Sequence, residues 1–361
     1  MIMSDKAKQH VESCRFCWMC HHICPVGNAT GHERSTPRAR ALGISLVNRN
    51  AIGLEEIMDN IYECAGCGAC VRDCMTGWDP VMFTKEVRLQ AALEDKLPEY
   101  INKLVDNCLE FGNAYGKASL CDDLANAIDG HKTNTDTLFL LGTDARYMAC
   151  EQASKAIKVL RKAGVSFTVL AEEPASGAQL DFLIGAAQET KEQMQNAANV
   201  MNKFKTVVCY DPADAKIIKQ TYGEYGIELD CKVVTYTSFL AELVKGGALK
   251  GADTGKTVVY QDPFQLSRDL EETEEAREVI SAFAVLHEMH LNRGETVWAG
   301  NILMAQYIPD VVKMIAERRI FNAKSLNEST IVTASVSEYV SLKAVADKEI
   351  EILSIEDLIL G

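Results

Sequence analysis

Two copies of one cysteine arrangement constrain this chain more than any other feature. Eight of the thirteen cysteines stand in the pattern C-x-x-C-x-x-C-x-x-x-C. The first copy is Cys14, Cys17, Cys20 and Cys24, and the second is Cys64, Cys67, Cys70 and Cys74. Two residues between thiols let one tight loop present three sulfurs to a shared site, while the fourth cysteine is displaced from it. The fold must therefore arrange two such loops around two metal sites.

The spacing is typical of bacterial two-cluster runs, in which the fourth cysteine of each run ligates the other 4Fe-4S cubane. The first copy also closes on Pro25, as that run does. We therefore predict two 4Fe-4S clusters with crossed ligation, in which the displaced cysteines fix the separation of the sites. The predicted sets are Cys14, Cys17, Cys20 with Cys74, and Cys64, Cys67, Cys70 with Cys24.

Zinc and disulfides are the alternative uses of cysteines at this spacing. A structural zinc takes four ligands, typically from paired C-x-x-C knuckles, so the third in-register cysteine of each copy would be surplus. Disulfide frameworks belong to small secreted domains, whereas this chain has 361 residues and no apolar signal core ahead of Cys14. His21 and His22 lie inside the first motif. Four cysteines already complete that site, so we expect these histidines to be supporting or surface residues.

The charge balance excludes some classes of partner. A net charge of −14 argues against nucleic acid, whose phosphates bind clustered Lys and Arg, and against an anionic lipid surface. No stretch approaches eighteen consecutive apolar residues, so we expect no transmembrane segment. Reduced thiols available for cluster assembly indicate a reducing, oxygen-poor cytoplasm.

Residues 1–115 predict an all-α domain around the cysteine motifs. Thr36-Pro37 provides a helix N-cap followed by a first-turn proline. Between 54 and 61 the apolar residues recur at i, i+3, i+4 and i+7, which is one face of a helix leading into the second motif. Further helices are expected to begin at Pro80 and Pro98.

Beyond Thr135, short β-rich runs alternate with helical segments, which predicts parallel α/β units. The expected strands cover 137–142, 165–171, 206–210, 232–236, 257–263, 284–291 and 330–336, and the expected helices cover 151–164, 213–226, 271–283 and 302–320. The two blocks align as a repeat of about 120 residues, with Thr137 matching Thr257. We therefore expect two similar domains, 135–250 and 255–361, joined near the glycine-rich stretch 245–256.

On these motifs, nearly the whole chain resembles iron-sulfur proteins with a twin-cluster helical ferredoxin domain followed by two cysteine-rich (CCG) domains. That group includes the D-type subunit of heterodisulfide reductase and the iron-sulfur subunits of glycolate oxidase and lactate-utilisation complexes. The resemblance implies an α + α/β fold class, in which an all-α ferredoxin-like domain with two cubane clusters precedes two repeated α/β domains of the CCG type. It also implies a role in electron transfer.

The C-terminal repeats depart from the family at its cysteines. The Cys-Cys-Gly positions are Ala175-Ser176-Gly177 and Trp298-Ala299-Gly300, and the family's His-Asp-Pro-Cys segment is Gln261-Asp262-Pro263-Phe264. The late cysteine-rich turn is Thr333-Ala334-Ser335. A cluster needs soft thiolate ligands, and Cys209 stands alone in the first repeat. We therefore expect both repeats to keep the scaffold without a metal, and we expect no disulfide reduction there.

Other residues favour structural roles. Cysteines outside the two motifs have no ligand spacing and are expected to be buried structural residues: Cys108, Cys121, Cys150, Cys209 and Cys231. His287 and His290 fall in an expected strand, where residues three apart point to opposite faces. Gly246-Gly247 follows no strand, so it favours a linker over a phosphate loop. Trp298 is expected either to fill the volume of a former cluster or to contact a partner.

The function predicted from the resemblance is a non-catalytic electron-transfer subunit. It would relay single electrons between a partner flavoprotein and another redox partner, with FAD or FMN on that partner. The flavoprotein would be an FAD-dependent oxidase or dehydrogenase, or an electron-transfer flavoprotein, in a hetero-oligomeric redox complex docked by the α/β domains. The alternative is a heterodisulfide-reductase-like oxidoreductase with its own active site between the C-terminal repeats, for which Asp262, Arg268 and His287 are candidates. A scaffold or redox sensor is a third possibility, although two clusters exceed what a structural staple requires.

Overall fold

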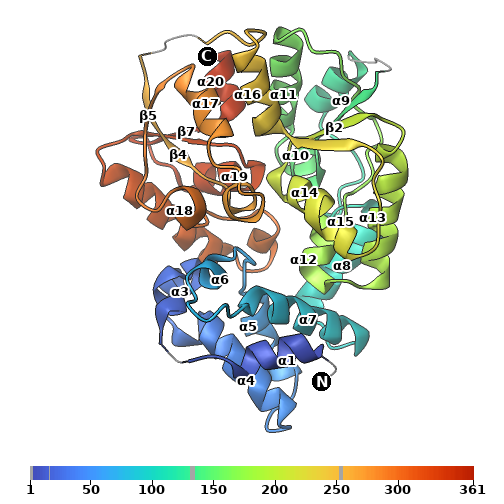
Figure 1. The fold of residues 1–361 in the computed structure, drawn as a ribbon, viewed down its shortest axis with the longest axis vertical. Helices are drawn as coiled ribbons and strands as arrows, with labels where there is room; N and C mark the ends of the chain where they lie inside the picture. The colour runs from blue at the N-terminus through green and yellow to red at the C-terminus, as the bar shows by residue number, and fades with distance from the viewer. Residues whose placement is uncertain (1–2, 16, 131–134, 252–254) are drawn as a thin grey trace.

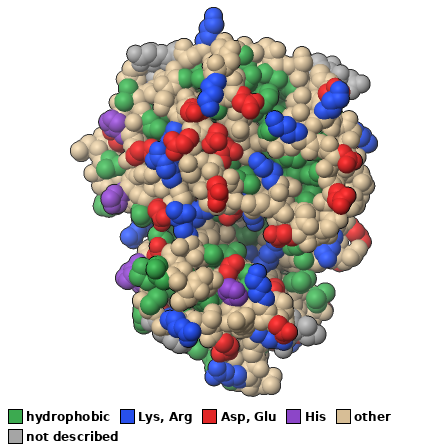
Figure 2. Space-filling model, in the orientation of Figure 1, with side chains coloured by type: hydrophobic (Ala, Val, Ile, Leu, Met, Phe, Trp, Pro, Cys, Tyr) green, Lys and Arg blue, Asp and Glu red, His purple; other side chains and the backbone are tan. Residues whose placement is uncertain are grey.

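A computed structural model describes residues 3–15, 17–130, 135–251 and 255–361. The helices of residues 5–111 lie together at one end of the molecule, and two α/β units stand side by side above them (Figure 1). The helix Asp122–Asp129 lies with the first of these units. The predicted mixture of helices and parallel sheets is confirmed. Acidic and basic side chains are interspersed over the face in Figure 2. No helix of the described residues is long and apolar enough to cross a membrane.

Short helices and turns make up the N-terminal part of the described chain. Its elements are α1 Asp5–Glu12, α2 Met19–Ile23, α3 Pro25–Thr30, η1 Glu33–Ser35, α4 Pro37–Asn48, η2 Glu55–Ile57, α5 Met58–Tyr62, α6 Ala69–Arg72, α7 Pro80–Leu93, α8 Glu99–Phe111 and α9 Asp122–Asp129. The predicted helix starts are confirmed, because Thr36 Oγ1 accepts from the Ala39 amide at 3.4 Å and α7 and α8 begin as expected.

The segment 54–61 buries its apolar face as predicted but is not one helix. It forms the 3₁₀ turn η2 and then the short helix α5, and the join lies at Ile57, where ψ is −6°. Its buried side chains, Leu54, Ile57, Met58 and Ile61, belong to a core cluster that α7 and α8 complete. Packing therefore stabilises this segment more than helix propensity does.

The first α/β unit contains a parallel sheet of order β1-β2-β3. Its strands are β1 Thr137–Leu140, β2 Thr206–Cys209 and β3 Lys232–Thr235. Its helices are α10 Thr143–Met148, α11 Cys150–Lys162, α12 Ala178–Ile184, α13 Gln188–Met201, α14 Pro212–Lys216, α15 Tyr222–Glu224 and α16 Tyr236–Lys245, with the π-helical turn η3 Ile217–Thr221. Leu138 is in register with Val207, and Val207 with Val233.

The second unit contains a parallel sheet of order β5-β4-β6-β7. Its strands are β4 Thr257–Gln261, β5 Val285–His287, β6 Thr330–Thr333 and β7 Glu351–Ser354. Its helices are α17 Glu275–Ser281, α18 Pro309–Lys324, α19 Val336–Val345 and α20 Ile355–Leu360, with the shorter turns η4 Gln265–Asp269, η5 Arg293–Glu295 and η6 Met304–Gln306. Val259 is in register with Ile331, and Ile331 with Ile352.

The two units share one topology. The strand predicted at 165–171 is wrong, since Thr168 makes only an isolated bridge to Leu138. The segment at Thr168 nevertheless runs beside β1, since the Phe139 amide donates to the Thr168 carbonyl at 2.8 Å. It therefore occupies the place in the first sheet that β5 occupies beside β4 in the second. Strands β1, β2 and β3 therefore correspond to β4, β6 and β7. Thr137 and Thr257 begin corresponding strands, as the repeat predicted.

Three predicted helices are shorter than expected, and the one expected over 271–283 is reduced to α17. The segment 213–226 breaks at η3, and the helix expected over 302–320 begins only at Pro309. Proline lacks the amide hydrogen that a helix interior needs, so it takes the first helical position. In the expected linker 245–256, Gly246 caps α16 and residues 252–254 lie outside the described residues. The domain boundaries themselves stay predictions.

The largest hydrophobic cluster runs through both α/β units. Phe139, Tyr210 and Tyr236 of the first unit belong to the same cluster as Tyr260 and Val332 of the second. Helix α16 packs on α17, and the corresponding helix α20 packs on α11. Each unit thus places its last helix against the other unit, which fixes how the two repeats face the N-terminal helices.

Candidate metal centre

The second cysteine motif surrounds a small cavity together with one cysteine of the first motif. Cys64, Cys67 and Cys70 line the cavity with Cys24. Gly66 and Gly68 have φ of 65° and 71°, so the loop turns through conformations that favour glycine. The sulfurs grouped here are those of one predicted crossed set.

The first motif lines a separate cavity with one cysteine of the second. Cys14, Cys17 and Cys20 lie there with Cys74. Both cavities therefore contain the combinations that crossed ligation requires, although the ligation itself stays a prediction.

Two short helices produce the crossing. Helix α2 follows the first loop and α6 follows the second, and the two helices are in contact. Cys24 lies at the end of α2, where its Sγ accepts from the Gly27 amide at 3.4 Å. Cys74 follows α6 two residues after its last helical position. Each helix thus carries the fourth cysteine away from its own loop and toward the other.

The chemistry of the donors fits iron-sulfur clusters. Each cavity offers four thiols, and a cubane takes one thiolate at each of four irons. Among the described residues there is no group of three or more His, Cys, Asp or Glu side chains arranged to hold a single metal ion. None of the eight motif cysteines forms a disulfide among the described residues.

Burial dominates the second set of thiols. It raises the pKa of Cys67 to about 11, while the nearby Arg268 guanidinium acts in the opposite direction. Burial also raises the pKa of Cys70 well above its ordinary value, and the neighbouring thiols Cys67, Cys64 and Cys24 raise it further. Iron binding at this site must therefore displace protons from thiols that otherwise keep them.

Three arginines surround the second motif: Arg40 and Arg88, which no sequence pattern singled out, and Arg268, which was expected only as a catalytic candidate. Arg40 is buried, donates to the Asn60 and Ser35 carbonyls, and lowers the pKa of Cys24 against the larger effect of burial. Arg88 donates to the Cys64 carbonyl at 2.7 Å. Arg268 donates to the Cys67 carbonyl at 2.8 Å. No local pattern identifies these arginines, because only the fold brings them to the cysteines.

The first motif lies at the surface. Cys17 is exposed, and three large apolar side chains beside it are exposed as well: Trp18 at 46%, Met19 at 44% and Met75 at 92%. Burial still raises the pKa of Cys20 to about 11. Burial acts in the same direction on Cys74, but hydrogen bonds from Thr76 outweigh it and lower the pKa of that thiol. One cysteine site is thus open to solvent and the other is enclosed.

Two positions of the second repeat at which the resemblance implied cysteines, Phe264 and Trp298, pack against the buried site. Trp298 is 2% exposed and shares a hydrophobic cluster with Phe264, Cys24 and Cys67. Core packing is therefore the observed role of Trp298 among the described residues. In the first repeat, Ser176 donates to Asp214, and Gly177 has φ 86° with Met194 so close that a Cβ would overlap it.

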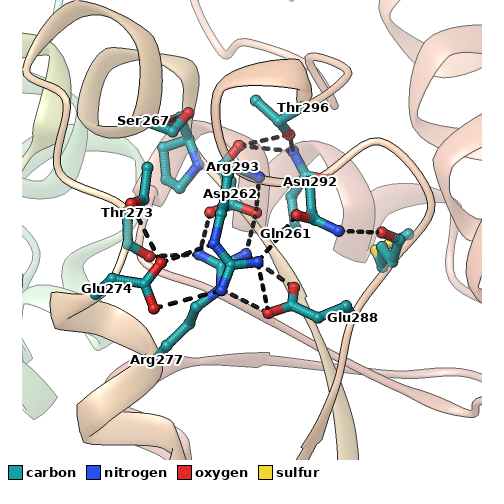
Figure 3. Close-up of polar contacts among 12 residues, drawn as sticks. Gln261, Asp262, Ser267, Thr273, Glu274, Arg277, Glu288, Asn292, Arg293 and Thr296 are labelled. Atoms are coloured by element: carbon teal, nitrogen blue, oxygen red, sulfur yellow. Dashed lines mark hydrogen bonds and ion pairs between the residues drawn. The ribbon is translucent and has the colours of Figure 1, made fainter.

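Asp262, Arg268 and His287 do not form a catalytic group, so that candidate constellation is wrong. Figure 3 shows Asp262 facing the Arg277 guanidinium, with Oδ1 to Nη1 at 2.6 Å and Oδ2 to Nη2 at 2.9 Å. On the other edge of the guanidinium, Arg277 Nε donates to Glu288 Oε1 at 2.8 Å. Asp262 therefore anchors the loop after β4. His287 instead bonds Glu328 from an exposed position, and Arg268 contacts the second cysteine loop.

The remaining cysteines are mostly structural. Cys108 and Cys209 are buried, as predicted, and Cys150 and Cys231 are partly buried. Cys121 is exposed at the start of α9, so the expectation of burial is wrong for it. His21 is a half-buried neighbour of Glu33 and does not line either cysteine cavity among the described residues.

A larger cavity begins at Cys64 and extends between all three parts of the chain. Its empty space, with the open solvent at its mouth included, is about 960 Å³. Residues of every part line it, including Arg88, Asp144, Asp211, Asp214 and Phe264. Burial raises the pKa of Asp214 to about 7, the Ser176 hydroxyl opposes that rise, and Asp144 and Glu173 add to it. The sequence analysis expected a cleft between the repeats, but the cavity also reaches the cysteine domain.

Comparisons with known proteins agree with this geometry. Residues 10–78 match the 4Fe-4S dicluster domain. The D-type subunit of the dihydromethanophenazine:CoB–CoM heterodisulfide reductase of Methanosarcina acetivorans is 24% identical over 361 residues, covering 90% of this chain and 86% of that one. Its namesake from Methanosarcina mazei is 24% identical, covering 87% and 83%. The chain is an iron-sulfur protein that resembles the D-type subunit of heterodisulfide reductase.

An uncharacterised iron-sulfur protein of Methanocaldococcus jannaschii is 22% identical to this iron-sulfur protein, covering 97% of this chain and 73% of that one. The likeness therefore extends through the α/β units as well as the cysteine motifs. The iron-sulfur protein has a ferredoxin-like 4Fe-4S domain at its N-terminus on a mixed helical and parallel-sheet scaffold, and it resembles oxidoreductase subunits.

Proposed function

We propose that this protein is an electron-transfer subunit that relays single electrons between a partner flavoprotein and another redox partner. Two 4Fe-4S clusters are held by crossed ligation, one by Cys14, Cys17, Cys20 and Cys74 and the other by Cys64, Cys67, Cys70 and Cys24. A 4Fe-4S cluster, when bound, exchanges one electron at a time. The observation that carries the proposal is the pair of four-cysteine cavities, one at the surface and one enclosed.

The chain's own residues supply the surroundings that such a relay needs. Arg40 and Arg268 place fixed positive charge beside the enclosed thiols and offset the negative charge of thiolates. Trp298 and Phe264 keep water from that site by packing on it. The flavin belongs to the partner in a hetero-oligomeric complex, and the word subunit in the relatives' names supports such a complex. The domains proposed for this role are 1–115, 135–250 and 255–361.

Replacement of Cys67 by Ser tests the ligand assignment. One thiolate is removed from the enclosed site, so about half of the iron should be lost and electron flow in the reconstituted complex should stop. The α/β units should stay folded, because the clusters around their sheets do not contain Cys67, which belongs with Phe264 and Trp298 to the cluster at the junction. Cys108→Ser is the matched control, since Cys108 is also a buried thiol of the N-terminal part. Unchanged iron content in the Cys67 variant would refute the assignment.

A second candidate function is an oxidoreductase with its own active site, because the large cavity places Cys64 next to side chains of both repeats. Asp211 and Asp214 would then provide protons to a substrate as it is reduced in the cavity. Ala213 lines the cavity outside the hydrophobic clusters of the described residues, so Ala213→Trp fills the space without disturbing a core. In the assay, the protein transfers electrons from reduced viologen to a small-molecule acceptor. If Ala213→Trp abolishes this reaction, the second function is favoured. An unchanged reaction favours the relay.

A further inference from the structure

At one position the two cysteine loops share a left-handed backbone conformation but carry very different residues. Trp18 has φ 68°, and Gly68, at the same place in the second motif, has φ 71°. Glycine adopts this left-handed conformation without steric cost, whereas a bulky aromatic residue is strained there. The loop geometry therefore favours glycine, and the first motif keeps a tryptophan despite the strain. Strained residues of this kind persist where they serve an interaction.

The second cysteine loop is covered by another part of the chain. Cys67 and Ala69 share a hydrophobic cluster with Phe264 and Trp298 of the second α/β unit. Arg268 of that unit also donates to the Cys67 carbonyl. Small residues in the second loop thus permit another part of the same chain to pack directly against it.

The first loop has large side chains in place of the small ones and no comparable cover among the described residues. Met19 stands where the second motif has Ala69, and it is 44% exposed. Trp18 and Met75 are exposed beside it, at 46% and 92%. These residues line the cavity that Cys14, Cys17, Cys20 and Cys74 share. An apolar surface therefore surrounds the solvent-facing cysteine site.

The charge of this end of the molecule differs from that of the rest. Residues 1–40 contain six Lys or Arg and three Asp or Glu, a net charge of +3, whereas the whole chain has −14. Arg15 and Arg38 line the cavity of the first motif, and no Asp or Glu is among its described lining residues. Arg38 lies over the Trp18 ring at 4.2 Å. An acidic protein is thus repelled less by this segment than by the chain as a whole.

We propose that Trp18, Met19, Met75 and Arg15 form the docking surface of an acidic electron-carrier protein. On the second cysteine loop, the corresponding face is covered by the second α/β unit. The partner supplies the missing cover and brings its own redox centre to the exposed cysteine site. This inference rests on the proposed function and deepens it, since it assigns the redox partner other than the flavoprotein to the helical domain.

Trp18→Gly is the decisive variant. Glycine suits the backbone at this position, as Gly68 demonstrates, so the substitution removes the apolar contact and relieves the strain together. The variant should keep its clusters and unfold at the same temperature as the wild type or higher. A merely structural tryptophan would show a lower unfolding temperature. Met75→Gln is a second variant at the most exposed residue of the surface, and Phe321→Ala on α18, 68% exposed, is the matched control.

The experiment uses anaerobically prepared full-length protein and an acidic bacterial two-cluster ferredoxin as the probe. Binding is measured by sedimentation with oxidised ferredoxin, and cluster reduction is measured by stopped flow with reduced ferredoxin and with dithionite. We expect at least about tenfold weaker binding and slower reduction by ferredoxin for Trp18→Gly and Met75→Gln. Dithionite, which needs no docking surface, should reduce all proteins equally. Added salt should weaken binding to the wild type.

Four results would overturn the docking proposal. They are wild-type protein that does not bind the ferredoxin, variants that bind as well as the wild type, an equal loss in Phe321→Ala, and self-association of the wild type that Trp18→Gly abolishes. If Trp18→Gly loses iron, Met75→Gln decides the matter by itself. A wild type without clusters would instead refute the proposed function.

Discussion

Arg268 of the second α/β unit donates from Nε to the carbonyl oxygen of Cys67 at 2.8 Å. The same guanidinium donates from Nη1 to the Thr296 carbonyl at 2.5 Å. One side chain thus connects the enclosed cysteine loop with the segment that leads to Trp298. The second α/β unit therefore supports a cysteine site of the N-terminal helices.

Arg268→Met should destabilise this junction. The substitution leaves two buried carbonyl oxygens without their donor, which costs about 2–3 kcal/mol. Thermal unfolding of the anaerobic protein should show a lower midpoint. Arg72→Met is the control, because Arg72 pairs with Glu295 at an exposed position and such a pair contributes less than about 1 kcal/mol. Equal midpoints for the two variants would contradict this account of the junction.

Arg40 should set the reduction potential of the enclosed site. Reduction adds negative charge beside Cys24 and Cys64, both of which attract the Arg40 guanidinium. Removal of the cation in Arg40→Gln should lower the potential by on the order of 100 mV. Arg40→Lys keeps the charge and should shift the potential much less. Redox titration followed by EPR measures both shifts, and a potential that rises in Arg40→Gln would be inconsistent with the role of the charge.

Asp214 should make stability fall as the pH rises. Burial raises its folded pKa to about 7, above its ordinary value of 3.8, so its stabilising effect is complete below about pH 4 and is lost as the pH rises through 7. Asp214→Asn keeps an acceptor for the Ser176 hydroxyl but cannot ionise. At pH 8 the variant should be more stable than the wild type by up to about 4 kcal/mol. Thermal unfolding midpoints of the wild type and the variant between pH 5 and 8 test this. Asp230→Asn is the control, because Asp230 is exposed.

Cys209→Ser should leave the iron content unchanged. Cys209 is buried within the hydrophobic cluster of the first sheet, far in sequence from either motif, and burial raises its pKa well above the ordinary value. Cys70→Ser, in contrast, removes a predicted ligand and should lose about half of the iron. Iron and sulfide assays on the two purified variants make the comparison. A matched loss in both would mean that the α/β units still bind metal.

The cysteine sets were predictable because their geometry is local. Two-residue spacing and a displaced fourth cysteine already imply a loop followed by one helical turn, and the cavities group Cys24 and Cys74 as that spacing requires. Helix starts were likewise readable at Thr36 and Asp79, since caps depend on neighbouring residues. The strand at 165–171 was not, because β-propensity cannot show that only Thr168 has a partner.

The surroundings of the site depend on distant contacts that no sequence pattern records. Arg268 reaches Cys67 across 201 positions, and Arg88 reaches Cys64 across 24. Asp262 and His287 looked available for catalysis in the sequence, yet the fold places Asp262 against Arg277 and His287 against Glu328. Residue type and spacing therefore predicted which cysteines lie together, but not the arginines that surround them.

The central claim is that this chain holds two 4Fe-4S clusters and no third. Iron and acid-labile sulfide content, measured with low-temperature EPR on anaerobically purified and dithionite-reduced protein, tests it most directly. The account predicts about eight irons per chain and the signals of two interacting 4Fe-4S clusters. About four irons would contradict the crossed pair, and about twelve would show that the α/β units bind a cluster of their own.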